Sequence, residues 1–264
     1  MEACARGTNG KLFLGQTRRL RHCIIMNAKQ ITIIPISAKD ANNKVKALHY
    51  SGKVVPNSQL HLGVFLNDKL EGVMQFGPSM RKDLIAPLVD NTHWNGFIEL
   101  NRMAFSEQLP RNSESRAIGV ALRMLKKYSP HIKWVISFAD ATQSGDGAIY
   151  RASGFLLTGI KRNSQLAINP DTNGVMHKIS AFHVGKEYEH SKWKKLEGFQ
   201  LRYIYFLDPA YRARLTVPEL PYSTISGMGA RMYKGVRLSG DTGETDNAAQ
   251  SNEQTEGASP IVSL

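Results

Sequence analysis

Apolar residues along this chain recur at two spacings, one typical of strands and one typical of helices. Short apolar runs that stop at glycine, proline or a polar turn predict the strands. These runs cover residues 30–36, 60–66, 71–76, 97–105, 134–139, 155–160, 175–182 and 201–207. The second and third runs flank Asn67, Asp68 and Lys69, so they predict a hairpin.

Helical spacing appears in three places between these runs. Residues 38–50 follow an approximate N-terminal capping pattern at Ser37 and Asp40. A second helix is predicted by apolar residues at i, i+3, i+4 and i+7, namely Ile118, Ala121, Leu122 and Leu125. A third, short helix covers residues 148–153, and Gly154 can supply its left-handed C-terminal cap. Up to residue 160 the predicted order is therefore β-α-β-β-β-α-β-α-β, two further strands follow, and there is no internal repeat.

The two ends of the chain differ from this patterned middle. Residues 1–25 form a basic N-terminal extension, and Met26 is an alternative start, because regular patterning begins just after it. Residues 26–238 carry the predicted domain together with a basic and aromatic C-terminal extension. Residues 239–264 are polar and hold no Lys or Arg, so we predict a disordered acidic tail.

Charge is distributed as unevenly as the patterning. The formal net charge is +12, but the tail holds five of the 22 acidic residues, so the rest has 34 basic against 17 acidic residues, or +17. Such a field attracts a polyanion, and nucleic acid is the commonest one, although a merely basic surface is the alternative.

Composition also limits the compartment and the partners. No stretch reaches the roughly 18 consecutive apolar residues of a membrane span, so we expect no membrane partner. The only cysteines are Cys4 and Cys23, which imply neither a disulfide framework nor a Cys–Cys zinc site. A reducing cytoplasm fits this pattern.

The order of elements resembles that of the acetyltransferase (GNAT) superfamily. The segment GAIYRASGF (147–155) is also similar to the late helix of that superfamily. The resemblance implies an α/β fold with a mixed central β-sheet flanked by helices. Two central strands of this sheet splay apart, and the gap admits a thioester donor such as acetyl-CoA.

Three segments carry a closer resemblance: ELNRMAF (99–105), FADATQSGDGAIYRASGF (138–155) and LRYIYFLDP (201–209). They are similar to the Mom family of DNA-modification proteins of bacteriophage Mu and its relatives. The resemblance covers about residues 1–238. It implies a transferase that converts adenine N6 in DNA to N6-(carbamoylmethyl)adenine and so protects phage DNA from host restriction.

The same resemblance implies the partners and the location. The substrate is double-stranded DNA with the adenine flipped out of the duplex. The protein acts in the cytoplasm of the infected bacterial host, and the oligomeric state stays open, with a homodimer as one candidate. Two other function classes compete: a conventional GNAT N-acetyltransferase of a protein or small amine, and a DNA-binding protein without catalysis.

Three residues are the candidate catalytic groups. Arg102 within a strand fits an anion clamp, or alternatively an ion pair with Glu99 or Asp140. Asp140 ends a buried strand and fits a base or metal ligand, or alternatively a turn residue. For Tyr150 the GNAT resemblance implies a proton donor to the leaving thiolate, and the alternative is an aromatic that packs the short helix. The Mom resemblance favours the functional interpretation of all three.

The start of the helix after the long strand is the candidate donor site, because a helix N-terminus favours phosphate. Asn112, Ser113 and Ser115 surround it, with Arg102 nearby in sequence; either serine could be a plain N-cap. The Mom resemblance points to Ser115. A GNAT loop would carry more glycine here, which puts ordinary coenzyme A binding in doubt.

Two donor classes fit the group that the resemblance implies. Simple acetyl transfer cannot make a carbamoylmethyl group, because acetyl lacks the nitrogen. An iron-assisted route from acetyl-CoA is one solution, and an activated glycine such as glycyl-tRNA is another. The resemblance implies iron, with His49 and Asp140 as candidate ligands and His61 as the alternative histidine.

Basic and aromatic residues alternate late in the chain, between residues 186 and 202. This pattern suits phosphate contacts and stacking of an extruded base, although a solvated helical face is the common alternative. The candidate DNA-binding residues are Lys192, Trp193, Lys194 and Lys195.

Overall fold

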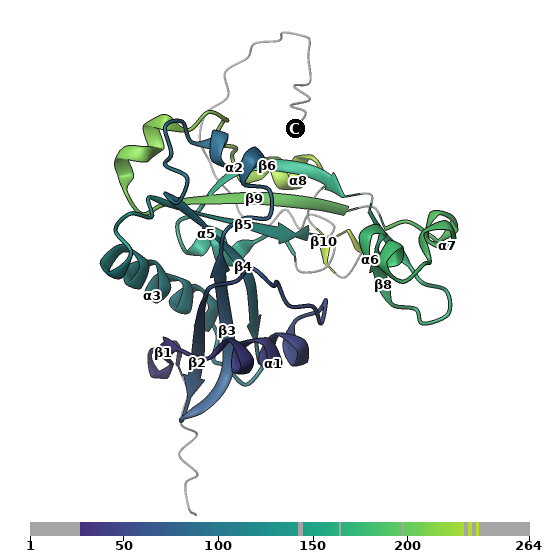
Figure 1. The fold of residues 1–264 in the computed structure, drawn as a ribbon, viewed down its shortest axis with the longest axis horizontal. Coiled ribbons are helices and arrows are strands. Elements are labelled where there is room, and N and C mark those ends of the chain that lie inside the picture. The colour runs from purple at the N-terminus through teal and green to yellow at the C-terminus, as the bar shows by residue number, and fades with distance from the viewer. Residues whose placement is uncertain are drawn as a thin grey trace, which may run out of the picture.

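The computed structural model describes residues 27–141, 145–163, 165–196 and 198–229, and the backbone at 232–233 and 236–237. The predicted N-terminal extension and acidic tail lie outside the described residues. Seven strands form one sheet in the order β1-β2-β3-β4-β5-β9-β6 (Figure 1). They are β1 (Thr32–Pro35), β2 (Leu60–Leu66), β3 (Lys69–Gly77), β4 (Phe97–Phe105), β5 (Trp134–Asp140), β6 (Leu156–Asn163) and β9 (Gly198–Phe206).

The predicted helices appear with nearly the predicted bounds. They are α1 (Ala38–Leu48), α3 (Ser113–Tyr128) and α5 (Ala148–Ala152). Ser37 caps α1 by accepting a hydrogen bond from the Asp40 amide. Gly154 has φ of 81° after α5, as a left-handed cap requires. Shorter helices complete this part: η1 (Ala28–Gln30), α2 (Lys82–Ile85), η2 (Ala86–Leu88), η3 (Pro209–Arg214) and α8 (Ser223–Gly227).

The β2–β3 hairpin forms at the predicted turn. Asn67 and Asp68 have φ of 49° and 62°, the left-handed values that a tight hairpin turn needs at both central residues. Every neighbouring pair in the large sheet is antiparallel except β4 and β5, which are parallel. A parallel pair needs a crossover, and α3 supplies it.

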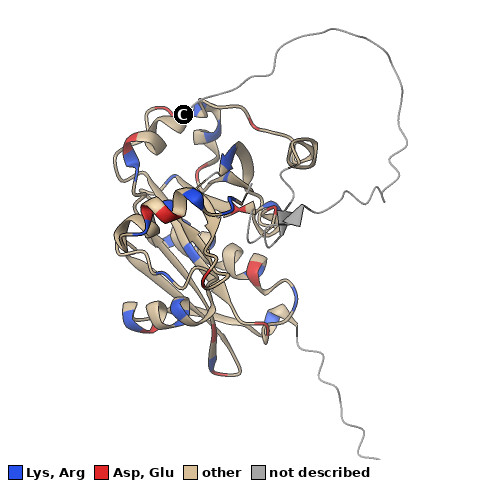
Figure 2. Cartoon of the chain, turned by 90° about the vertical axis from the view of Figure 1, so that its right-hand side faces the viewer, with Lys and Arg blue, Asp and Glu red and all other residues tan. Residues whose placement is uncertain are grey.

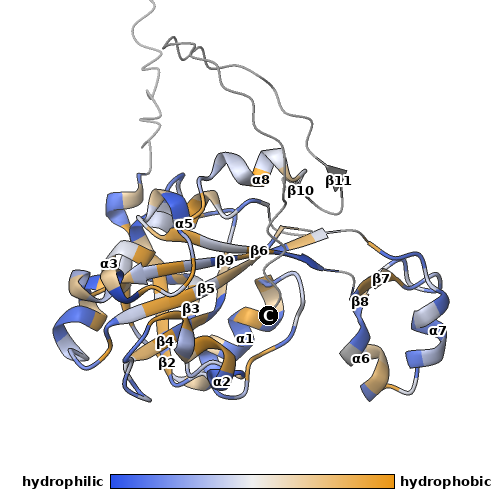
Figure 3. Ribbon diagram, turned by 90° about the horizontal axis from the view of Figure 1, so that it is seen from above, coloured by the Kyte–Doolittle hydropathy of each residue, from blue (hydrophilic) through white to orange (hydrophobic). Residues whose placement is uncertain are grey.

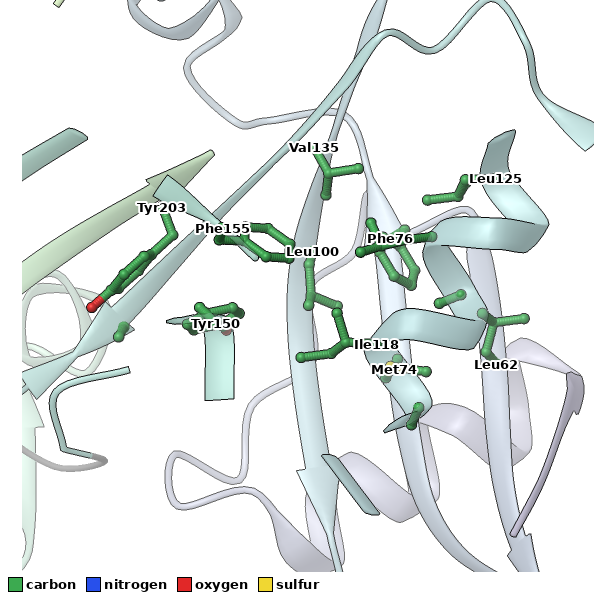
Figure 4. Close-up of a cluster of buried hydrophobic side chains, with 14 of the residues drawn as sticks. Leu62, Met74, Phe76, Leu100, Ile118, Leu125, Val135, Tyr150, Phe155 and Tyr203 are labelled. Atoms are coloured by element: carbon green, nitrogen blue, oxygen red, sulfur yellow. The ribbon is translucent and has the colours of Figure 1, made fainter. Parts of the chain in front are cut away.

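The sheet buries both of its faces. On one face α3 and α5 pack against alternate residues of the strands, around Met74, Phe76 and Leu100 (Figure 4). On the other face α1 packs against Val73 and Ala104. A third cluster on that second face joins Trp134, Ile136 and Ile204 to α2, η2 and η3, and includes Ile85, Leu88, Val89 and Phe97.

The two parallel strands separate soon after they meet. Their ladder holds three pairs, and its last pair joins Glu99 to Ile136. Just beyond, β4 carries a bulge, because Gln75 pairs with Arg102 while Phe76 pairs with Leu100 and leaves Asn101 unpaired in the ladder. The predicted GNAT-like mixed sheet with splayed central strands is therefore confirmed.

One strand prediction was wrong. The run 175–182 forms strand only as β8 (Val175–His177), and α6 (Lys178–His183) follows it. A short apolar run has no periodicity that separates a strand from a helix. Here β8 pairs only with the three-residue β7 (Leu166–Ile168), and the chain then turns Ala181 inward and Phe182 outward.

β7, β8, α6 and α7 (Glu187–Lys192) make up a small unit of residues 165–196, which the predicted order lacked. We call it the 165–196 unit. It connects β6 to β9 and projects away from the large sheet (Figure 3). A last hairpin, β10 (Met232–Tyr233) with β11 (Val236–Arg237), lies near the end of the described chain.

Candidate active site

A cavity of about 260 Å³ lies where β4 and β5 separate. Its walls come from the end of α1, the middle of β4, the end of β5, the loop before α5 and α5 itself. Four of the predicted residues line it together: Arg102, Asp140, Tyr150 and His49. A splayed parallel pair leaves strand ends without a neighbour, so polar side chains can face a ligand there.

Asp140 lies at the carboxyl end of β5, where the sequence places it. The Tyr50 hydroxyl, just beyond α1, donates a long hydrogen bond of 3.5 Å to Asp140 Oδ2. Burial, with the Asp140 charge as the next cause, raises the pKa of Tyr50 to about 12. Tyr50 therefore stays protonated near neutral pH and can donate a hydrogen bond to the Asp140 carboxyl group.

Tyr150 is held in place from below by a second tyrosine. Its ring stacks on that of Tyr203 with 5.1 Å between centroids. The Tyr203 hydroxyl donates a 2.5 Å hydrogen bond to the Asp146 carbonyl, which fixes the loop before α5. Gly147 starts α5 with φ of 71°, and a Cβ there would lie 2.6 Å from the Tyr203 ring. Only glycine allows this close approach.

The Tyr150 hydroxyl is buried and shares a 2.9 Å hydrogen bond with Ser137 Oγ. Ser137 also donates to the Leu100 carbonyl at 3.2 Å. Since a serine hydroxyl has one proton, Tyr150 donates to Ser137 in one arrangement and is free to donate elsewhere in the other. Burial raises the pKa of Tyr150, so the phenol is neutral and can act as a proton donor.

Arg102 is fixed by backbone carbonyls. Its Nε donates to the Lys53 carbonyl at 3.1 Å, and its Nη1 donates to the Asn101 carbonyl at 2.8 Å. Within the described chain no ion pair of Arg102 is present, so the alternative of a salt bridge to Glu99 or Asp140 is not what holds it. Burial lowers the pKa of Arg102, and the more distant Glu99 attracts its charge.

His49 lies beside Tyr50, with 4.3 Å between the ring centroids. Burial, aided by the Arg102 charge, lowers the pKa of His49 to about 4, so the imidazole is neutral near pH 7. The alternative histidine, His61, lies outside the cavity, where the Gln75 amide contacts its Nδ1 at 3.1 Å. No group of three or more metal-binding side chains occurs among the residues that the structure describes.

The three residues predicted for the donor site lie at the start of α3 and do not line this cavity. Asn112 has φ of 69° and its side chain caps nothing. Both serine hydroxyls donate to carbonyls instead of capping amides: Ser113 to Pro110 at 2.6 Å and Ser115 to Asn112 at 3.2 Å. The first-turn amides of α3 are thus not covered by these side chains.

The predicted DNA-binding residues lie at the end of α7 and just after it. Lys192 lies over the exposed Tyr188 ring at 4.0 Å, and Lys194 is exposed. Trp193 packs beside the buried His190. The Lys195 ammonium is used internally, because it contacts His190 Nδ1 at 3.1 Å and the His190 carbonyl at 2.5 Å.

Sequence reasoning missed three polar residues at this site: Tyr50, Asn101 and Ser137. Ser137 had a signal, since it is a polar residue in the middle of an otherwise apolar buried strand. The only sequence signal for Tyr50 is that it directly follows the candidate residue His49. Asn101 had no sequence signal, because only the bulge in β4 turns it into the site.

Sequence comparisons identify the relatives of this chain. The profile of the Mom protein family matches residues 30–224. The methylcarbamoylase Mom of Escherichia phage Mu is 41% identical over 128 residues, which are 48% of this chain and 53% of that protein. The chain therefore spans about half the length of the relative that it matches.

Solved structures offer weaker likenesses. An N-acetyltransferase from Staphylococcus aureus Mu50 has a TM-score of 0.44 and 10% identity, over 67% of this chain and 99% of its own. The ribosomal-protein-S18-alanine N-acetyltransferase from Escherichia coli has a TM-score of 0.41 and 12% identity, over 67% and 94%. The fold assignment rests on the topology described above. The family match covers most of the described residues, and the chain belongs to the Mom protein family.

Proposed function

We propose that this chain is a DNA-modifying transferase that adds a carbamoylmethyl-type group to N6 of adenine. The observation that carries the proposal is the convergence of Asp140, Tyr150 and Arg102 on one cavity between splayed strands. A relative named methylcarbamoylase supports the choice of group. The modification would protect phage DNA from restriction in the cytoplasm of the infected host.

The site provides the proton transfers that acyl transfer needs. The adenine amine is a poor nucleophile, and it must leave the duplex to be reached. Its nitrogen attacks the acyl carbon, Asp140 accepts the proton that the nitrogen loses, and a C–N bond forms. As the bond from the acyl carbon to the donor breaks, the Tyr150 hydroxyl protonates the departing group.

The donor is an activated acyl compound, for which two chemical classes compete. Acetyl-CoA supplies two carbons but no nitrogen. A glycyl ester, as in glycyl-tRNA, supplies both carbons and the nitrogen. Acyl transfer from it gives N6-glycyladenine, an isomer of N6-(carbamoylmethyl)adenine in which N6 is bonded to the carbonyl carbon. The carbamoylmethyl form then requires a rearrangement that moves N6 to the methylene carbon. The leaving group of the glycyl transfer is a ribose hydroxyl. The first turn of α3 with Ser115 offers amides to a donor phosphate without a glycine-rich loop.

Iron does not fit the residues present. His49, Asp140 and Asp146 all line the cavity, but among the described residues no group of three or more His, Cys, Asp or Glu side chains is placed to hold a metal ion. The steps above use no metal, and each proton is moved by a side chain of this protein.

The charge supports DNA as the polyanion that carries the substrate. Lys and Arg positions are spread over many elements (Figure 2). Lys192 and Lys194 add exposed charge on the 165–196 unit, and Lys192 lies over the exposed aromatic ring of Tyr188. Such a mixture suits contacts with phosphates and with unstacked bases.

Mass spectrometry of nucleosides from DNA co-expressed with the full chain tests the proposal. We expect a modified adenosine of the carbamoylmethyl or glycyl mass, and none with Asp140→Asn. Glycine labelled at carbon and nitrogen should place both labels on the same base if glycine is the donor. An acetylated base, or an unmodified DNA with an acetylated amine, would support a conventional acetyltransferase instead.

A further inference from the structure

We propose that His49 acts in this cavity as a neutral hydrogen-bond donor through Nε2–H, directed at the acyl carbonyl oxygen, and does not bind iron. This inference rests on the proposed acyl transfer. It goes beyond it by giving the histidine a form and a role that the geometry of its neighbours dictates.

The tautomer of His49 follows from the groups that surround its Nδ1. The Ser51 backbone amide donates a hydrogen bond to His49 Nδ1 at 3.2 Å. A backbone amide can only donate, so Nδ1 must present its lone pair and carries no proton. A neutral imidazole has one N–H, which therefore lies on Nε2.

A second contact agrees with this tautomer. Ser51 Oγ lies 2.8 Å from His49 Nδ1 and accepts the Lys53 amide at 3.3 Å. Because the Lys53 amide already donates to the Ser51 oxygen, the Ser51 hydroxyl can donate its own proton to His49 Nδ1. Arg102 holds the same turn from outside, since its Nε donates to the Lys53 carbonyl. The turn that selects the tautomer is thus anchored on both sides.

This tautomer is the wrong one for a metal ligand. A histidine that binds a metal through Nε2 donates its Nδ1–H to a carbonyl or carboxylate. Here Nδ1 faces an amide hydrogen, so a proton on Nδ1 would meet another donor. The Arg102 guanidinium also lines the cavity and repels a divalent cation.

The same tautomer suits the developing charge of acyl transfer. When N6 attacks the acyl carbon, the carbonyl oxygen gains negative charge, and a fixed N–H stabilises it. His49 lines the cavity with Asp140 and Tyr150, and no hydrogen bond of the described residues involves its Nε2. The proton on Nε2 is therefore available to a ligand.

Replacing His49 with glutamine and with alanine separates hydrogen-bond donation from iron binding. The side-chain amide of His49→Gln places an N–H close to the position of Nε2 and is a poor iron ligand. We expect His49→Ala to lower kcat by about 10²–10³-fold, the usual loss for one donor to an oxyanion, and His49→Gln to restore most of it. The exposed His131→Gln is the matched control and should leave kcat unchanged.

Nitrogen NMR of the full chain with ¹⁵N-labelled histidine gives a readout without activity. We expect a protonated Nε2 and a bare Nδ1 at neutral pH, unchanged when Fe²⁺ is added. A protonated Nδ1, or Fe²⁺-dependent changes at His49, would overturn the inference. So would His49→Gln that melts like wild type but is as inactive as His49→Ala. If wild type modifies no DNA, the proposed function fails, and the NMR result still decides the form of His49.

Discussion

The cavity and the 165–196 unit differ in how much regular structure holds their residues in place and in how exposed their side chains are. The cavity residues lie on or beside long strands of a seven-stranded sheet, and Tyr150 and Ser137 are buried beneath it. The 165–196 unit has only a three-residue ladder and two helices of six residues each. Two of its aromatic residues face outward, since Phe182 is 62% and Tyr188 is 71% exposed.

The difference fits the proposed function, in which the cavity carries out the transfer and the 165–196 unit binds DNA. A transfer reaction needs groups held to within a fraction of an ångström, which a hydrogen-bonded sheet provides. Binding a long, flexible polymer needs reach and exposed charge, which a projecting unit provides. The two regions meet at Lys53, whose ammonium donates to Ser180 Oγ while its carbonyl accepts from Arg102. Changes in the cavity should affect rate, and changes in the unit should affect affinity.

Exchanging an aspartate in each region tests this division most strongly. Asp140→Asn should lower kcat by about 10²–10⁴-fold, the range for losing a general base, with little loss of stability. Asp171→Asn is the matched control, because this exposed aspartate of the unit pairs only with Lys186 at 3.8 Å. Nucleoside mass spectrometry in single-turnover reactions gives both rates. Comparable activity of Asp140→Asn and wild type would remove the carboxylate from the mechanism.

Tyrosine exchanges give the next largest effect. Tyr150→Phe removes the proposed proton donor and should lower kcat by about 10²-fold. It should cost about 1 kcal/mol of stability, because Ser137 loses one partner but keeps the Leu100 carbonyl. Tyr188→Phe in the 165–196 unit is the control and should change neither kcat nor stability. A donor whose leaving group needs no proton should restore the Tyr150→Phe rate, and failure to do so would indicate a structural role for Tyr150.

The sequence predicted the cavity better than the unit, for a physical reason. Strands such as 97–105 and 134–139 are apolar, bounded and followed by a polar residue, so their period and ends identify them. Arg102 and Asp140 stand out because charge is expensive inside such strands. The splay of β4 and β5 is predicted by resemblance, and the bulge at Asn101 has no local signal, because it arises from the register of three strands.

The 165–196 unit was harder to predict from the sequence, because its helices and strands are short. β8 and α6 share one apolar run, and only the three-residue pairing with β7 decides where strand gives way to helix. The basic run predicts one surface, yet Lys195 contacts the buried His190 while Lys192 faces solvent. A sequence shows that a lysine is charged but does not show which way its ammonium points.

Lysine exchanges in the unit should therefore have two outcomes. Replacing Lys192 and Lys194 with Gln should weaken DNA binding and reduce the salt slope by about 2, close to one for each phosphate that is no longer neutralised. kcat at saturating DNA should stay unchanged. Lys195→Gln should instead lower the stability of the unit, through His190, with less effect on the slope. Fluorescence anisotropy over a salt series measures the slopes, and equal slopes in all three proteins would place the DNA-binding surface elsewhere.

The smallest predicted effect is a change in the pH dependence of stability, and it concerns Glu99 on β4. Burial raises the pKa of Glu99, although hydrogen bonds from Ser79 and Asn101 and the Arg102 charge oppose the shift. The folded protein thus binds this proton more tightly than the unfolded chain. The contribution of Glu99 to stability is fully present below the unfolded pKa of about 4.3 and is lost as pH rises through the folded pKa.

Glutamine mimics the protonated form, so Glu99→Gln should be more stable than wild type near neutral pH, and the difference should vanish at low pH. Urea denaturation over a pH series measures it. Glu187→Gln is the control in the 165–196 unit, because its exposed pair with Lys178 at 3.7 Å contributes little at any pH. If Glu99→Gln is instead less stable at neutral pH, the carboxylate must gain more from Ser79, Asn101 and Arg102 together than it loses by burial. The surroundings of Glu99 would then favour its charged form, and the anchoring of Arg102 would include Glu99 as well as the two carbonyls.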